Sequence, residues 1–183
     1  MAFPDLTDEE LEARLVELHA DSYGWALNCC GHDDAEAEDV LQTTYVKVLS
    51  RRATWARRSS FRTWLFGIVR FTALERHRRE RSLERRAERA SHEDLDGIVG
   101  SIAPTDAAVT ESFGNGPVEP QRLRDALAGL SDRQREVLHL VFYQGLTVAE
   151  AADAMDVSVG SARTHYHRGK ERLRTLLAVE EPA

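Results

Sequence analysis

The chain has 183 residues, 42% hydrophobic and 30% charged, a composition typical of one or two small globular domains without any apolar run of membrane-spanning length. Its acidic N-terminus is unlike a secretory signal, and the adjacent Cys29 and Cys30 offer neither an ordinary disulfide nor a CxxC pair, so we expect a cytoplasmic protein. The net charge of −7 hides an uneven distribution, because residues 1–50 carry 12 acidic and 2 basic side chains whereas residues 51–90 carry 13 arginines and 4 glutamates.

The first predicted element is an acidic helix over residues 31–49, GHDDAEAEDVLQTTYVKVL. Its apolar side chains recur at helical spacing and predict a buried face made of Ala37, Val40, Leu41, Tyr45, Val48 and Leu49. The opposite side carries Glu36, Asp39, Gln42, Thr43 and Val46. An exposed valine among polar side chains is typical of a protein interface.

The carboxylates of this segment could instead hold a metal ion together with His32. Most of them lie at the start of the predicted helix, where the helix dipole favours negative charge. We therefore expect no metal and no cofactor.

The basic segment that follows predicts a loop and a second helix. Residues 51–60, RRATWARRSS, are polar around Trp55 and indicate a surface loop. In the helix over residues 61–79 the inner side comprises Phe61, Leu65, Ile68 and Thr72, flanked by Trp64 and Val69. The arginines left for solvent or phosphate are Arg62, Arg70, Arg76, Arg78 and Arg79.

Two properties of this basic segment favour a nucleic acid as its partner. Screening confines exposed charges to about 10 Å, so a local excess of arginine can bind a polyanion whatever the total charge. The aromatic side chains Trp64, Phe66 and Phe71 could stack on unpaired bases, or they could simply pack in the core.

Residues 91–121 predict a flexible linker, since they are poor in large apolar residues and contain three prolines and a GNG cluster. A coil of this length spans about 30 Å and a fully extended chain about 100 Å. A short helix over residues 98–102 is possible within it.

The last predicted element, over residues 130–177, is a helix-turn-helix. Thr147 and Glu150 form a capping box at the start of its first helix, and residues 156–158 form the turn. Ser158 can cap the second helix. In that helix a buried stripe is predicted from Val159, Ala162, Tyr166, Leu173 and Leu177.

The opposite face of the second helix favours DNA. Its side chains are Ser161, Thr164, Arg168 and Arg172, with His165 and His167 beside them and Arg163 and Lys170 nearer the apolar edge. Hydroxyls and histidines can approach base edges, arginine can form two hydrogen bonds to guanine, and amides near Ser158 can bind a phosphate. A solvated face on a three-helix packing unit is the alternative.

The order of these elements resembles the bacterial extracytoplasmic-function (ECF) sigma factors, a family of RNA polymerase sigma factors. The terminal helix-turn-helix is shared with many response regulators, so AEDVLQTTYVKVL followed by FRTWLFGIVRFTALERHRR carries most of the resemblance. The resemblance implies an all-α protein of two small helical domains joined by a flexible linker. Residues 8–90 would form a helical bundle similar to sigma region 2, residues 91–121 the linker, and residues 122–183 a helix-turn-helix similar to region 4.

By this resemblance the protein would be a promoter-specificity subunit without catalytic activity. Its partners would be the clamp helices and flap of core RNA polymerase, the −10 and −35 promoter elements, and an anti-sigma factor or another regulator. The implied polymerase contacts are Glu36, Asp39, Gln42, Thr43 and Val46. The implied −10 contacts are Trp55, Arg57, Arg58, Arg62, Trp64, Arg70, Phe71, Arg76, Arg78 and Arg79. The implied −35 contacts are Ser158, Ser161, Arg163, Thr164, His165, His167, Arg168, Lys170 and Arg172.

The sequence departs from the family's common pattern at two of these positions, since a glutamate is frequent at the position of Thr43 and an asparagine at that of Phe71. Two other classes of protein stay open. One is a stand-alone dimeric regulator with an N-terminal sensory domain, which would bind duplex DNA without polymerase. The other is a helical metal-dependent enzyme that uses His32 and its acidic neighbours.

Overall fold

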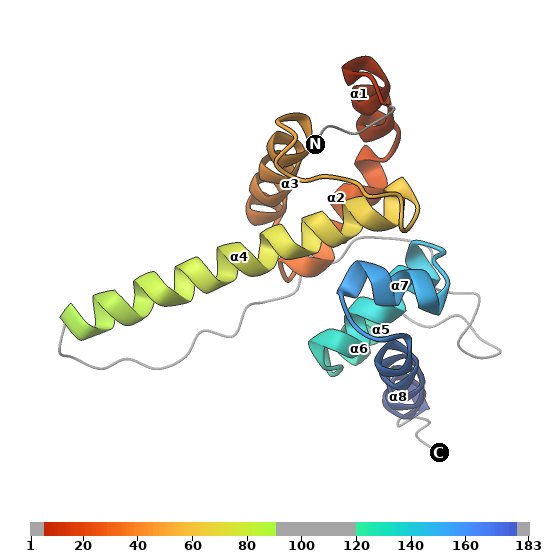
Figure 1. The fold of residues 1–183 in the computed structure, drawn as a ribbon. Coiled ribbons are helices and arrows are strands. Elements are labelled where there is room, and N and C mark those ends of the chain that lie inside the picture. The colour runs from red at the N-terminus through yellow and green to blue at the C-terminus, as the bar shows by residue number, and fades with distance from the viewer. Residues whose placement is uncertain (1–5, 91–119, 179–183) are drawn as a thin grey trace. The chain divides into compact units, whose positions relative to one another are not determined.

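A computed structural model describes residues 6–90 and 120–178, and in these ranges every regular element is a helix (Figure 1). The described residues form two compact units, the first from residues 6–56 and 68–90 and the second from residues 57–67 and 120–178. The predicted all-α fold with two small helical parts is confirmed. None of the helices in the described ranges has both the length and the apolar character that crossing a membrane requires.

The first unit begins with two helices that the sequence analysis does not predict, α1 (Asp8–Glu17) and α2 (His19–Cys29). Thr7 and Glu10 form a capping box at the start of α1, in which each side chain accepts a hydrogen bond from the other residue's backbone N–H. Trp25 of α2 is completely buried. The buried residues of this unit include Leu11, Leu15, Ala26, Val40, Leu41, Val48 and Val69.

Helix α3 (Asp34–Leu49) begins at Asp33, whose side chain accepts a hydrogen bond from the backbone N–H of Glu36 at 2.9 Å. The expected buried face is confirmed at Ala37, Val40, Leu41 and Val48, whereas Tyr45 is half-buried, Leu49 is exposed, and Thr44 is buried instead. Leu49 lies 100° around the helix from Val48, whereas Thr44 lies one turn before Val48 on the buried face.

Helix α4 (Phe61–Ala90) continues past the predicted end at residue 79. Its inner face agrees with the prediction at Phe61, Leu65 and Thr72, which are buried, whereas Ile68 is only half-buried. Arg70 differs, because only 7% of its surface is exposed. It lies four residues after the fully buried Phe66, which places both on the same side of the helix.

The second unit contains α5 (Pro120–Ala128), α6 (Asp132–Leu138), a π-helical turn η1 (His139–Tyr143), α7 (Val148–Met155) and α8 (Val159–Ala178). Pro120 and Gln121, which the sequence assigns to the linker, belong to α5. The rest of the predicted linker, with the short helix over residues 98–102, lies outside the described residues.

The helix-turn-helix of α7 and α8 is confirmed. The backbone N–H of Glu150 donates to Thr147 Oγ1 at 3.2 Å and that of Thr147 donates to Glu150 Oε2 at 2.9 Å, which completes the predicted capping box. Asp156 ends α7 in the left-handed conformation, with φ of 52°. The predicted cap of α8 is present too, since the N–H of Ser161 donates to Ser158 Oγ at 3.1 Å.

The buried side of α8 packs on α5 and α6, where Ala126, Leu130, Leu138 and Leu173 form one cluster with Phe142 and Tyr166 against it. Val159 is exposed although the sequence predicts it to be buried, because it is the first residue of the helix. Gly169 is buried instead, and the missing side chain lets α8 approach α6 closely.

Candidate protein and nucleic-acid interfaces

The outer side of α3 presents four exposed side chains, Asp39, Gln42, Thr43 and Val46, which we call the α3 surface. They follow one another at three-, four- and seven-residue steps, so they lie on one side of the helix. Val46 is 54% exposed, an apolar side chain beside a carboxylate, an amide and a hydroxyl. A surface of this composition is suited to a protein partner.

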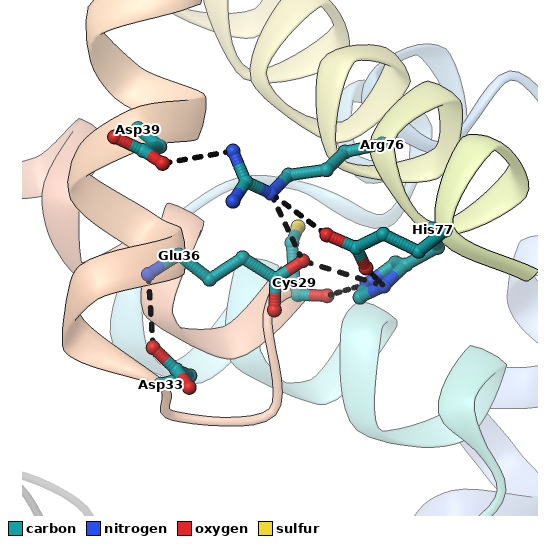
Figure 2. A network of polar contacts seen from close by, with 7 residues as sticks. Cys29, Asp33, Glu36, Asp39, Arg76 and His77 are labelled. Carbon is teal, nitrogen blue, oxygen red and sulfur yellow. Dashed lines mark hydrogen bonds and ion pairs between the residues drawn. The ribbon is translucent and has the colours of Figure 1, made fainter. Parts of the chain in front are cut away.

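Glu36, expected on the same surface, turns towards α4 and is half-buried. It belongs to an ion-pair network with Asp39, Arg76, His77 and Glu80 (Figure 2). Arg76 Nη1 donates to Asp39 Oδ2 at 2.9 Å, and Arg76 Nε lies 3.2 Å from Glu80 Oε1 and 3.8 Å from Glu36 Oε1. The network therefore joins α3 to α4.

His77 provides a second connection within the network. Its Nδ1 lies 3.4 Å from Glu36 Oε1, and its Nε2 lies 3.3 Å from the backbone carbonyl oxygen of Cys29 at the end of α2 (Figure 2). Burial raises the pKa of the Glu36 carboxyl above its ordinary value, while the positive charges of His77 and Arg76 act in the opposite direction.

Glu36, His77 and Glu80 are also the kind of cluster that can bind a metal, since their ligand atoms lie within 4.8 Å of one another. Arg76 already places a positive charge against both carboxylates, which disfavours a metal ion at the same place. His32, the histidine considered in the sequence, does not belong to this cluster.

The basic loop over residues 51–60 is irregular, as predicted. Trp55 is half-buried, and the guanidinium carbon of Arg14 lies 6.0 Å from its ring centroid. Arg57 and Arg58 are exposed, and Arg57 has a positive φ of 56°. An exposed basic loop beside an indole ring is suited to a nucleic-acid strand.

The predicted −10 residues on α4 differ in how exposed their side chains are. Phe71 is 53% exposed, with Lys47 Nζ 5.6 Å from its ring centroid, and Arg78 and Arg79 are exposed. Trp64 is half-buried against Phe61, at 5.3 Å between ring centroids. Arg62 is half-buried, and its guanidinium carbon lies 5.3 Å from the ring centroid of Phe66.

Helix α8 presents a polar and basic face, and its exposed members are Ser158 at the cap, Ser161, Arg163, Thr164, His167, Arg168 and Arg172. His165 and Lys170 are half-buried. Lys170 Nζ lies 5.3 Å from the ring centroid of Tyr166 and 5.9 Å from that of Phe142, which agrees with its predicted place near the apolar edge.

The structure thus brings Asp39, Gln42, Thr43 and Val46 together on α3. Arg76 lies beside Asp39 and not among the exposed arginines of α4. Neither His77 nor Glu80 is among the site residues that the sequence predicts. The spacing of Arg76 and Glu80, four apart on one helix, does indicate an ion pair.

Comparison with known proteins gives two family matches. Residues 15–83 match the family described as Sigma-70 region 2, and residues 121–173 match Sigma-70, region 4. The chain is 30% identical over 146 residues to the ECF RNA polymerase sigma factor SigX of Bacillus subtilis (strain 168), which covers 78% of this chain and 71% of SigX. It is 33% identical over 143 residues to the RNA polymerase sigma factor CarQ of Myxococcus xanthus, which covers 78% of this chain and 75% of CarQ.

Among solved structures, the sigma factor RpoE in complex with the anti-sigma factor NepR, from Bartonella quintana, has a similar fold. The TM-score is 0.70 at 23% sequence identity, over 94% of this chain and 99% of RpoE.

Proposed function

The chain belongs to the ECF sigma factors of RNA polymerase, and on this premise we propose which of its surfaces hold the polymerase and the promoter. As a sigma factor it directs core RNA polymerase to specific promoters and takes part in the initiation of transcription. We assign polymerase and −10 binding to residues 8–90, a linker role to residues 91–119, and −35 binding to residues 120–183. No catalytic step is assigned to any residue.

We propose that the α3 surface binds the clamp helices of core polymerase. The exposure of Asp39, Gln42, Thr43 and Val46 on one side of one helix is the observation that carries this proposal. A surface that combines a carboxylate and an amide with an exposed valine supplies both the polar and the apolar contacts that protein interfaces use.

A reconstituted transcription assay tests this assignment. Asp39→Arg combined with Gln42→Arg should abolish transcript from a cognate promoter, because it reverses the charge at the centre of the α3 surface. Glu9→Arg combined with Ala13→Arg is the matched control, since it makes the same change of charge at exposed positions of α1, outside the α3 surface. An unchanged transcript yield from the first variant would refute the assignment.

The basic loop and the exposed side of α4 are the proposed −10 contacts, through Trp55, Arg57, Arg58, Arg62, Trp64, Phe71, Arg78 and Arg79. Extruding a base costs a few kcal/mol, which stacking on an aromatic ring, worth about 1 to 3 kcal/mol, can offset. Arg70 is buried, so a phosphate contact from it would require the side chain to move.

The exposed face of α8 is the proposed −35 reader, with Arg163, Thr164, His167 and Arg168 nearest the bases. A two-hydrogen-bond contact from Arg168 to guanine would contribute about 1 to 3 kcal/mol of discrimination. Selection of promoter sequences by the Arg168→Ala holoenzyme should lose the preference at one −35 position. The exposed Arg174 on the same helix, replaced by alanine, is the control that should keep the selected sequence.

A stand-alone regulator is not favoured, because both sigma regions are matched in one chain. A regulator of the anti-sigma type is a further proposed partner, since RpoE of Bartonella quintana was solved in complex with one. Pull-down with core polymerase distinguishes a sigma factor from a stand-alone regulator, because a stand-alone regulator would bind duplex DNA and leave the polymerase in solution.

A further inference from the structure

Arg76 differs from the other arginines of α4 in what holds its side chain. Its guanidinium faces three carboxylates from two helices, Asp39 and Glu36 on α3 and Glu80 on α4 (Figure 2). The shortest contact is to Asp39, 2.9 Å from Nη1. Arg78 and Arg79, two and three residues further along the same helix, are exposed.

A phosphate contact would cost Arg76 these ion pairs. Its side chain is 37% exposed, and moving it to a DNA strand would break its ion pairs with Asp39 and Glu36. A half-buried carboxylate such as Glu36 is destabilised when its partner is removed. Arg78 and Arg79 can reach a phosphate without that loss.

The contact with Arg76 orients the side chain of Asp39. Asp39 belongs to the α3 surface, and its side chain stays 56% exposed while one oxygen accepts the hydrogen bond from Arg76. The carboxylate is therefore fixed in one orientation and still accessible to a partner. Fixing a side chain before association removes an ordering cost that otherwise weakens binding.

The position of Arg76 is supported from a third helix. His77, the next residue, contacts Glu36 through Nδ1 and the Cys29 carbonyl oxygen at the end of α2 through Nε2. These contacts hold this part of α4 against α2 and α3, so the guanidinium meets Asp39 in a defined geometry.

We propose that Arg76 is a positioning residue of the polymerase surface, which orients the Asp39 carboxylate for the clamp helices, and is not a contact to the promoter strand. The inference rests on the proposed function of the α3 surface. It reassigns an arginine that the family resemblance places on the −10 element.

A double-mutant cycle on the full chain tests the coupling. Equilibrium binding of fluorescently labelled protein to core polymerase should weaken about three- to tenfold for Arg76→Gln and for Asp39→Asn, and no further when both are combined. Arg76→Lys should recover part of the loss, since it keeps a charge near Asp39. Lys47→Gln is the control for simple loosening of the two helices, because Lys47 joins α3 to Glu75 of α4 at 2.6 Å without touching Asp39. Lys47→Gln should leave the affinity for core polymerase unchanged when its melting temperature matches that of Arg76→Gln.

The second measurement concerns DNA. Holoenzyme assembled at saturating polymerase binds single-stranded oligonucleotides selected from a random pool by the unmodified holoenzyme. Arg79→Gln should weaken this binding, whereas Arg76→Gln should not.

Each contrary result has a distinct meaning. Additive losses in the cycle, or a loss of oligonucleotide affinity for Arg76→Gln equal to that for Arg79→Gln, overturn the positioning role while the polymerase surface stands. If the Asp39→Asn variant binds core polymerase as tightly as the unmodified chain, the Asp39 carboxylate contributes nothing to binding and the inference is overturned. Failure of the unmodified chain to bind core polymerase overturns the proposed function itself, and the inference with it.

Discussion

The two adjacent cysteines differ sharply in their surroundings. Cys30 is buried, and this burial, with the negative charge of Glu36, raises the pKa of its thiol to about 12. Cys29 is half-buried at the end of α2. Because the thiolate is the nucleophile, only about one Cys30 in ten thousand is reactive at pH 8.

We therefore expect iodoacetamide to modify Cys29 much faster than Cys30 in the folded protein at pH 8. Mass spectrometry of Cys29→Ser and Cys30→Ser variants measures each thiol alone, and unfolding in guanidinium should make the rates similar. Equal rates in the folded state would contradict the burial of Cys30.

For single residues, the helical periodicity of the sequence predicts most of the buried side chains but not the partners of the charged ones. The buried side of α3 followed from spacing, since Ala37, Val40 and Leu41 recur at helical steps. The burial of Arg70 and the ion pairs of Arg76 did not, because a long basic side chain can point either to solvent or into the molecule, and spacing along one helix does not decide between them.

Among the elements, α7 depends on its capping box. The hydrogen bonds from the Thr147 backbone and hydroxyl lower the pKa of Glu150 below 4.5. This contribution to stability is present above the unfolded pKa and is lost as the pH falls through the lowered, folded pKa. Thr147→Ala should cost about 1 kcal/mol at pH 7 and should make stability less sensitive to pH below 4.5.

Urea unfolding of the two proteins at pH 7 and at pH 3.5 to 4.5 measures both effects. Thr175→Ala is the control, because Thr175 is exposed and its hydroxyl donates to the Glu171 carbonyl oxygen within α8 without capping a helix. The backbone N–H of residue 147 remains in this variant, so parallel pH curves for Thr147→Ala and the unmodified protein would argue against the contribution of the Thr147 hydroxyl to the lowered pKa of Glu150.

The approach of α8 to α6 depends on Gly169. A Cβ there would lie 3.2 Å from Gln134 Cβ and from Leu138 Cδ1, whereas a Cβ at Gly160 would meet only Ser158 Oγ at 3.8 Å. Gly169→Leu should lower the free energy of unfolding by about 1 to 3 kcal/mol or more, because it overpacks this contact. Gly160→Leu on the same helix should change it by less than about 0.5 kcal/mol in urea titrations. Similar losses at both positions would contradict the packing argument, because leucine has a higher helix propensity than glycine and should not destabilise an exposed helical position.

The helix-turn-helix was the easiest element to predict, because Thr147, Glu150 and Ser158 mark the helix starts with their own side chains. Helices α1 and α2 were missed although Thr7 and Glu10 form a capping box. The π-helical turn over His139–Tyr143 has no comparable mark, since no side chain caps its start.

For the whole molecule, the distribution of charge matters more than its sum. The −7 total would disfavour DNA, yet 13 of the 24 basic residues lie in residues 51–90. Arginine contacts to phosphate release counterions, so promoter affinity should fall steeply with salt. The proposed function places Arg57 and Arg58, both exposed in the basic loop, among these contacts.

Replacing both by glutamine should reduce the slope of log K against log salt, measured for holoenzyme on a promoter between 50 and 200 mM salt, by about 1.4 if both contact an unpaired strand. Arg135→Gln combined with Arg174→Gln removes the same charge from exposed or half-buried positions outside the proposed contacts. That control should keep the original slope, because a charge far from the strand is screened and releases no counterion. Equal reductions for the two pairs would mean that promoter binding responds to total charge, and the local basic block would lose its assigned role.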